Sequence, residues 1–307
     1  MTASPLRLAG YVDLPAHKAK GGFDHAAVHA ASGHVYVAHT ANDAIDVFDA
    51  QKYLFSIPGL PGVAGALVSD EANLIFSSNR SENTIGIFAP GPDPEVTKVK
   101  VGIAPNGLAY DPGRKLLLAA NLGDPAIARS HTVTMVDAGD RTVRAEIALP
   151  GSTRWTVFDP DAEVFYVNIT DPAVIAVIDA KKPDRLAHML AVPAAGPHGL
   201  DLDRTTHRLF CACDAGMLFT LDARSGKILS ALPLSGKPDV TFFNRQRQQL
   251  YVAIGDPGVI DVFSTSRMEK IATIETEKGA HTTAMWPAGD WLCAFLPATH
   301  RAAVYET

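Results

Sequence analysis

Side chains able to bind a metal ion or an anion recur along this 307-residue sequence at intervals of 40 to 48 residues. Each stands at the start of a short apolar run that ends in a turn. Two imidazoles and one or two carboxylates around an open space could hold a divalent ion and leave positions for water or substrate. The recurring positions are Asp24, Ala64, Asn106, Arg154, His198, Asp239 and His281, of which only Ala64 is apolar.

The apolar runs belong to a longer repeat that predicts four β-strands per unit. Each copy has two runs rich in Val, Ile, Leu, Phe and Tyr, split by Asn, Asp, Gly or Pro, which is typical of two strands joined by a tight turn. A further run precedes each copy and another follows it. The copies are VYVAHTANDAIDVFD (35–49), FYVNITDPAVIAVID (165–179), LFCACDAGMLFTLD (209–222), LYVAIGDPGVIDVFS (250–264) and the looser LIFSSNRSENTIGIFA (74–89).

Seven such units fill the chain, and four-stranded units of about 40–45 residues form the blades of a β-propeller. We therefore predict one all-β domain over residues 1–307, a seven-bladed propeller; six blades is the rival count if a unit is misread. The unit at 281–307 holds only three strands, whereas residues 7–15 form an orphan strand. We expect this N-terminal strand to complete the last blade and close the ring.

Composition excludes several classes of function. The net charge is −6 and no Lys/Arg run or aromatic-basic interleaving occurs, which argues against nucleic-acid and anionic-membrane partners. No apolar stretch approaches the roughly 18 residues of a spanning helix, and the N-terminal residues lack a signal-peptide layout. Three cysteines cannot form a disulfide framework. We expect a cytoplasmic protein, a monomer or weak homo-oligomer.

The repeated strand pairs resemble the YVTN-repeat family, the YncE-like bacterial propellers, over essentially the whole chain. More distantly they are similar to metal-dependent propeller lactonases and lyases. The resemblance implies the propeller fold, and it implies either a binding role or lactonase-like or lyase chemistry. Many members of the family are exported, so the lack of a secretion signal here is a departure from the pattern.

The ring positions predict a metal centre at one rim of the central channel. We expect His198, Asp239 and His281 to hold Zn, Fe, Mn or Ni, with Asp24 or His25 as a fourth ligand or a general base. A bound metal would polarise a carbonyl or acidify water. The alternative is a polar channel in which these side chains hydrogen-bond ordered water.

Two arginines point to an anionic ligand at the same rim. Arg154 lies in the ring, Arg80 lies in a loop expected on the same face, and no turn requires either. A guanidinium beside a metal can hold a carboxylate or phosphate by a two-pronged hydrogen bond. The alternative for Arg154 is an ion pair with Asp24 or Asp239. The neighbouring Trp155 either walls the pocket or packs between blades.

Together these residues predict a metal-dependent hydrolase or lyase, lactonase-like, that acts on a small anionic organic substrate. Asp24, His25 and Arg154 would serve the chemistry. The alternative is a propeller that binds a metal, small ligand or protein without turnover. No Gly-x-Ser-x-Gly elbow, phosphate-binding loop or dinucleotide fingerprint is present. The residues expected to contact the substrate are Arg80, Asn106, Trp155, His39, Asn168 and His300.

Overall fold

Short strands alternate with tight turns along the described part of the chain, residues 4–307, in this computed structural model. These residues form 28 strands and a single 3-10 turn at Thr40–Asn42. Within 4–307 no helix has the length and apolar character needed to cross a membrane.

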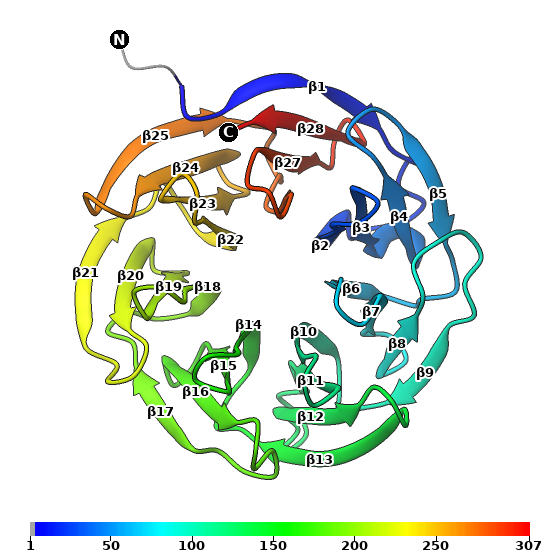
Figure 1. Cartoon of the computed structure of the whole chain (residues 1–307), viewed down its shortest axis with the longest axis vertical. Helices are drawn as coiled ribbons and strands as arrows, with labels where there is room; N and C mark the ends of the chain where they lie inside the picture. The colour runs from blue at the N-terminus through cyan, green and yellow to red at the C-terminus, as the bar shows by residue number, and fades with distance from the viewer. Residues whose placement is uncertain (1–3) are drawn as a thin grey trace.

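The strands form seven four-stranded antiparallel sheets arranged as blades around a central axis (Figure 1). The seven-bladed propeller is thereby confirmed and the six-bladed count is excluded. From the axis outward, the blades are β2 (Phe23–His29), β3 (His34–His39), β4 (Ala44–Phe48), β5 (Tyr53–Ile57); β6 (Val63–Ser69), β7 (Leu74–Asn79), β8 (Thr84–Phe88), β9 (Thr97–Lys100); β10 (Pro105–Asp111), β11 (Leu116–Asn121), β12 (Thr132–Asp137), β13 (Thr142–Ala148); β14 (Thr153–Asp159), β15 (Val164–Ile169), β16 (Val174–Asp179), β17 (His188–Ala191); β18 (Pro197–Asp203), β19 (Arg208–Cys213), β20 (Met217–Asp222), β21 (Ile228–Pro233); β22 (Pro238–Asn244), β23 (Gln249–Ile254), β24 (Val259–Ser264), β25 (Glu269–Glu275); and β26 (Thr283–Met285), β27 (Trp291–Leu296), β28 (Arg301–Glu306), β1 (Arg7–Asp13).

The seventh blade takes its outermost strand from the other end of the sequence. β1 pairs antiparallel with β28, from Arg7 opposite Glu306 to Asp13 opposite Arg301. The expectation that the N-terminal strand closes the ring is confirmed. β28 is therefore not left with an unpaired edge.

A repeated side-chain contact shapes the turn between the first and second strands of the blades. The side-chain oxygen of the last inner-strand residue accepts hydrogen bonds from the backbone N–H groups two and three residues later in the sequence. Asp159 accepts from Asp161 and Ala162 in this way, and Asn244 accepts from Gln246 and Arg247. Asp and Asn favour turns for this reason, so the polar residue after each apolar run sets where the strand ends.

Hydrophobic side chains pack between neighbouring blades. The middle strands are buried on both faces, which explains their continuous apolar runs. Between the first two blades, for example, Tyr36 and Ile45 pack with Val63, Ile75 and Phe88, all less than 2% exposed. Seven such clusters hold the ring together, so every blade depends on its neighbours for its core.

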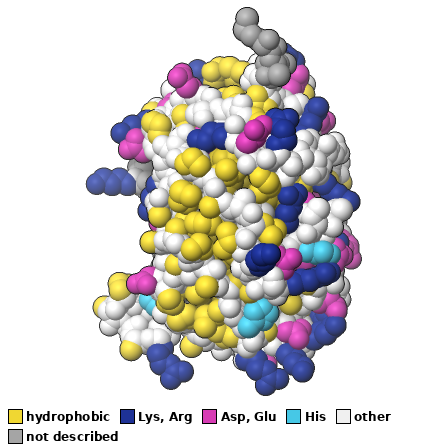
Figure 2. Space-filling model, turned by 90° about the vertical axis from the view of Figure 1, so that its left-hand side faces the viewer, with side chains coloured by type: hydrophobic (Ala, Val, Ile, Leu, Met, Phe, Trp, Pro, Cys, Tyr) yellow, Lys and Arg dark blue, Asp and Glu magenta, His cyan; other side chains and the backbone are white. Residues whose placement is uncertain are grey.

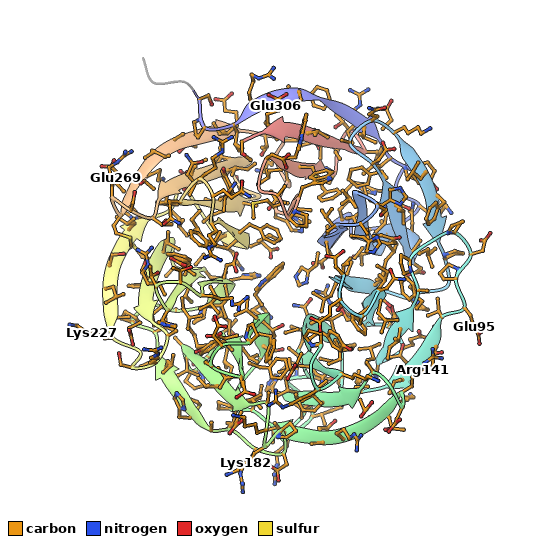
Figure 3. The ribbon with its side chains drawn as sticks, viewed as in Figure 1. Glu95, Arg141, Lys182, Lys227, Glu269 and Glu306 are labelled. Atoms are coloured by element: carbon orange, nitrogen blue, oxygen red, sulfur yellow. The ribbon has the colours of Figure 1, made fainter. Side chains whose placement is uncertain are left out.

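Charged side chains gather at the perimeter, where the labelled residues of Figure 3 point outward. The side at the left of Figure 1, with β21 and β25 as outer strands, carries many hydrophobic side chains among the charged ones (Figure 2). Leu229 of β21 is 48% exposed there.

Candidate functional site

Six blades contribute side chains to one mouth of the central channel. The predicted ring positions lie at the second residue of each inner strand in six blades, and His281 lies two residues before β26. Five of these positions, all except Ala64 and His281, line a cavity of about 290 Å³. Its wall consists of Asp24, His25, Arg80, Asn106, Leu122, Arg154, His198 and Asp239.

An irregularity of the inner strands aims these side chains at the channel. In β2 the pairing with β3 jumps from Phe23 to Ala26, which leaves Asp24 and His25 outside the regular ladder. The same shift occurs at the ring position of β6, β10, β14, β18 and β22. A β-bulge changes the direction of side chains and is common beside functional sites. Adjacent residues such as Asp24 and His25 can therefore both face the cavity.

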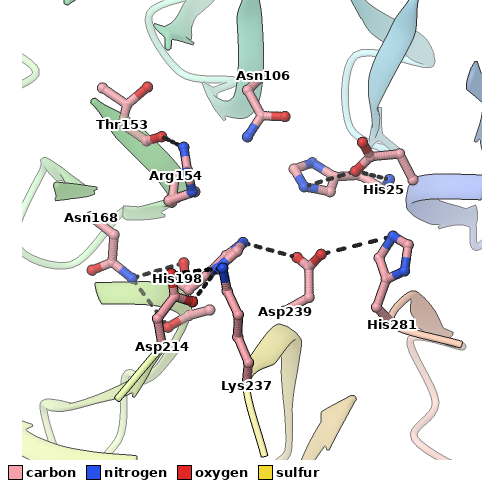
Figure 4. Close-up of polar contacts among 12 residues, drawn as sticks. His25, Asn106, Thr153, Arg154, Asn168, His198, Asp214, Lys237, Asp239 and His281 are labelled. Carbon is pink, nitrogen blue, oxygen red and sulfur yellow. Dashed lines mark hydrogen bonds and ion pairs between the residues drawn. The ribbon is translucent and has the colours of Figure 1, made fainter. Parts of the chain in front are cut away.

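A chain of alternating carboxylates and imidazoles crosses one half of the mouth (Figure 4). Nδ1 of His198 lies 2.7 Å from Oδ1 of Asp214, and its Nε2 lies 3.4 Å from Oδ1 of Asp239. The other oxygen of Asp239 lies 3.9 Å from Nε2 of His281. Lys237 contacts the outer end of the chain, with Nζ 3.2 Å from Oδ2 of Asp214.

These contacts favour the protonated form of His198. Burial disfavours the charged imidazolium, but Asp239 and Asp214 outweigh it and raise the pKa of His198 to about 9. Burial would raise the pKa of Asp239, yet His198 and His281 hold that pKa well below its usual range. At neutral pH, His198 is therefore a cation between two carboxylates.

The opposite half of the mouth contains an ion pair beside a neutral imidazole. Nη2 of Arg80 lies 3.1 Å from Oδ2 of Asp24 and donates a hydrogen bond to Oδ1 of Asn106. The backbone N–H of His25 donates to Oδ1 of Asp24 at 3.0 Å. Burial lowers the pKa of His25, and its ring packs against Trp155 with centroids 4.3 Å apart.

Arg154 has a different environment from Arg80. Its Nη1 donates to the carbonyl oxygen of Thr153 at 3.0 Å and approaches Oγ of Ser152 at 3.4 Å. No carboxylate within residues 4–307 forms an ion pair with Arg154, and Asp24 is bound by Arg80 instead. The ion-pair interpretation of Arg154 is therefore not what the structure shows. Its guanidinium lines the mouth with donors left over.

The donor set was tested for its fit to a metal ion. Asp239 lies between His198 and His281 and presents a different oxygen to each (Figure 4). Among residues 4–307, no group of three or more His, Cys, Asp or Glu side chains has the geometry of a metal site. Nδ1 of His281 donates to the carbonyl oxygen of Gly279 at 2.7 Å, and its Nε2 faces Asp239. The metal stays a prediction for metal analysis to test.

Three residues expected to contact substrate lie away from the mouth cavity. His39 is fully buried, with Nδ1 2.5 Å from Oδ2 of Asp46. Asn168 is also fully buried and donates to the carbonyl oxygens of His198 and Gly199, so it positions the inner strand β18. His300 packs on the ring of His17 at 4.4 Å. His39 is the last residue of β3, Asn168 the last but one of β15, and His300 directly precedes β28. The two imidazoles turn into the joint between the first and last blades.

Sequence reasoning assigned no role to two charged residues of the mouth network. Asp214 directly follows β19, the second strand of its blade. Asn and Asp are also common in ordinary turns at this position, so the residue type did not distinguish Asp214 from a turn residue. Lys237 directly precedes β22 and has no counterpart in the repeat. Only the position of His198 relative to both makes them part of one charge network.

Comparisons with known proteins show a likeness in fold and none in sequence. No family model and no curated protein matches the chain. A solved chain of hydrazine synthase from Kuenenia stuttgartiensis is similar in structure, with a TM-score of 0.82 and 13% identity. The match covers 100% of this chain and 99% of that chain. The likeness supports the seven-bladed propeller, and the YVTN-repeat resemblance stays a prediction.

Proposed function

We propose that this propeller binds a small organic anion through its carboxylate at the mouth of the channel. The observation that carries the proposal is Arg154, a guanidinium on the cavity wall without a carboxylate partner in the described chain. A buried or half-buried charge usually has a partner, because leaving water is costly for an unpaired ion. A ligand carboxylate would supply that partner by a two-pronged hydrogen bond.

The electrostatics of the mouth favour the same ligand. Protonated His198 adds a second cation beside Arg154, and Asn106 offers its amide N–H groups from the neighbouring blade. A cavity of about 290 Å³ suits a small ligand. The four cationic side chains Arg80, Arg154, His198 and Lys237 exceed the three carboxylates Asp24, Asp214 and Asp239 by one charge.

Proton-transfer catalysis is a second candidate, favoured by one specific observation. The same cavity is lined by His25, which burial holds neutral, and by His198, which two carboxylates hold protonated. Environments that separate the pKa values of two groups create a base and an acid at one pH. A hydrolase or lyase acting on the bound anion would use His25 to accept a proton and His198 to donate one.

Isothermal titration of the purified protein with acetate, lactate and succinate tests the binding proposal. We expect wild type to bind at least one of them and Arg154→Gln to weaken that binding at least tenfold, because a charge-assisted pair is lost. Arg185→Gln is the matched control, since Arg185 lies in the same blade but is exposed outside the channel. Binding of none of the three, or equal loss in both variants, would refute the proposal.

The same protein should be analysed for metal by mass spectrometry. Near-stoichiometric Zn, Fe, Mn or Ni that is lost in His281→Ala would support the metal-dependent form of the activity. Succinate binding that persists after treatment with a chelator would show that the anion site works without a metal.

A further inference from the structure

A second and larger cavity, the lumen, lies farther along the central channel from the mouth. It measures about 490 Å³, and the inner strands of several blades form its wall. Small side chains on this wall, such as Ala27 and Ala109, leave the space open. Volumes of this size are typical of pockets for small molecules.

The lumen opens on the face opposite the mouth. Its wall continues to Pro160 and Arg204, which directly follow the inner strands β14 and β18 and are exposed to solvent. On the mouth side, rings from three blades meet. His25 packs against Trp155 with centroids 4.3 Å apart, and Trp155 meets Phe242 edge-on at 6.2 Å. A ligand can therefore reach the lumen from the opposite face without passing the mouth.

One charged side chain interrupts an otherwise apolar ring around the lumen. The fifth residue of each seven-residue inner strand lines this cavity. In β18 that residue is Asp201, and in the other strands of this kind it is apolar. The apolar members of the ring are Ala27, Leu67, Ala109, Val157 and Phe242. Asp201 is therefore an exception at a position that the other blades fill with apolar side chains.

Asp201 has hydrogen-bond donors beside it but no partner of opposite charge among residues 4–307. Its Oδ1 accepts from the backbone N–H of Leu202 at 2.7 Å, and its Oδ2 accepts from that of Phe243 at 2.6 Å. Arg204, the arginine on the lumen wall, instead forms a two-pronged pair with Asp161, at 3.0 and 2.7 Å. Each oxygen of the Asp201 carboxylate therefore keeps the capacity to accept a further hydrogen bond.

This carboxylate is costly to keep charged. Burial raises the pKa of Asp201 to about 7, although the two backbone N–H groups act in the opposite direction. Buried charges in proteins are usually paired, because an ion loses its hydration when it leaves water. A ligand that brings a cation to Asp201 would offset this cost.

The surroundings of Asp201 indicate the kind of cation that fits. Free acceptor positions on both oxygens suit a cation that donates hydrogen bonds, such as a primary ammonium. The rings of Trp155, Phe158 and Phe242 line the same cavity, and aromatic faces pack on apolar groups and attract cations. Because the N–H of Phe243 bonds to Asp201, the adjacent Phe242 and the carboxylate stand at the same level of the lumen.

We propose that the lumen binds a small apolar primary amine, with its ammonium group at Asp201 and its apolar body against Phe242 and Trp155. This site goes beyond the proposed function, because it opens on the other face and selects the opposite charge. It does not depend on Arg154. Burial of the apolar body supplies affinity, and the ion pair with Asp201 supplies the preference for an amine.

Isothermal titration with phenethylamine and its uncharged analogue phenethyl alcohol tests this assignment. At pH 8 the Asp201 carboxyl is mostly ionised and the amine still carries its proton. We expect wild type to bind the amine at least tenfold more tightly than the alcohol, because only the amine forms a charge-assisted pair. Asp201→Asn should remove this preference. Asp184→Asn, which changes an exposed carboxylate outside the channel, should keep it.

A second variant tests the place of binding. Ala27→Phe puts a ring on the lumen wall, where the half-buried Ala27 leaves room, and should weaken amine binding at least tenfold. Ala231→Phe on the exposed outer strand β21 is the matched control and should bind as wild type does. Circular dichroism reports whether each variant is folded. If Asp201→Asn does not fold, the amine-to-alcohol ratio of wild type and Ala27→Phe still decide.

Several outcomes would overturn the amine site. They are no binding of phenethylamine to wild type, equal affinity for the amine and the alcohol, a preference that survives in a folded Asp201→Asn, and binding that Ala27→Phe leaves unchanged. None of these results bears on acetate binding at the mouth, so the two proposals stand or fall separately.

Discussion

At the scale of single residues, the two halves of the mouth differ in how far their charges are satisfied. Asp24 and Arg80 neutralise each other, whereas Arg154 bonds, among residues 4–307, only to a carbonyl and a hydroxyl oxygen. His198 is fixed through both ring nitrogens by carboxylates. A ligand anion would therefore complete the half that contains Arg154 and would leave the other half unchanged.

The ionisation of His198 can be measured directly. We expect a pKa of about 9, because Asp239 and Asp214 outweigh the effect of burial. Acetate affinity should therefore fall as the pH rises through that value and the imidazolium loses its proton. NMR titration of the His198 ring measures this pKa, and Asp214→Asn should lower it.

Asp184→Asn, an exposed carboxylate outside the channel, should leave the pKa of His198 unchanged. A His198 resonance that titrates near the ordinary value of 6.5 would contradict the charge network. A resonance that does not titrate and shifts on chelation would instead indicate a metal ligand.

At the scale of elements, β1 joins the last blade through one face only. Val12 is 1% exposed and packs with Val304 and Phe295, while the adjacent Tyr11 is 53% exposed. The alternation is confined to the end of the strand, since residues 7–9 are all exposed and Val12 is its one buried side chain. The hydrogen bonds to β28 and the buried face of β1 together close the ring.

Adjacent positions on β1 provide a matched test of this closure. Val12→Ala should lower the free energy of unfolding by about 2 kcal/mol, because it leaves a cavity between β1 and β28. Tyr11→Ala should cost less than about 1 kcal/mol, as is usual for an exposed position. Urea denaturation followed by fluorescence compares the two. Equal effects would show that β1 contributes little to the packing of the last blade.

At the scale of the whole molecule, a histidine cluster connects the segment after β1 with the first and last blades. Nδ1 of His17 lies 2.6 Å from Nε2 of His39, which bonds through Nδ1 to Asp46. The ring of His300 lies 4.4 Å from that of His17. Burial, His39 and His300 lower the pKa of His17, although Asp46 acts in the opposite direction.

The cluster should make the stability of the ring depend on pH. A folded-state pKa below the ordinary 6.5 means that the unfolded chain binds the proton more tightly, so stability falls as the pH falls through that region. When the pH is lowered from 7.5 to 5.5, the melting temperature of His17→Gln should fall less than that of wild type. His188→Gln, on the exposed outer strand β17, should behave as wild type. Identical losses in all three proteins would exclude the cluster as a cause.

Local sequence patterns were sufficient to predict the architecture. Apolar runs, turn residues and a period of about 43 residues indicated seven four-stranded blades, and the orphan strand at 7–15 indicated the ring closure. The strands and turns depend on interactions within a hairpin, which neighbouring residues determine. The ring closure followed from the repeat, because the last unit lacked one strand and the N-terminal segment supplied one. The same alignment placed the polar ring positions at corresponding points of their strands. In the structure all of them except His281 lie at the second residue of an inner strand and line the mouth.

The partners of those side chains were decided only by the tertiary structure. Asp24 pairs with Arg80 and not with Arg154, His39 turns toward Asp46, and Asp214 meets His198. The bulges that let adjacent residues such as Asp24 and His25 share the channel, and the apolar lumen below them, follow no local pattern. Each depends on distances of a few ångströms between different strands or blades. Such distances arise from the packing of the complete ring, so no window of sequence contains them.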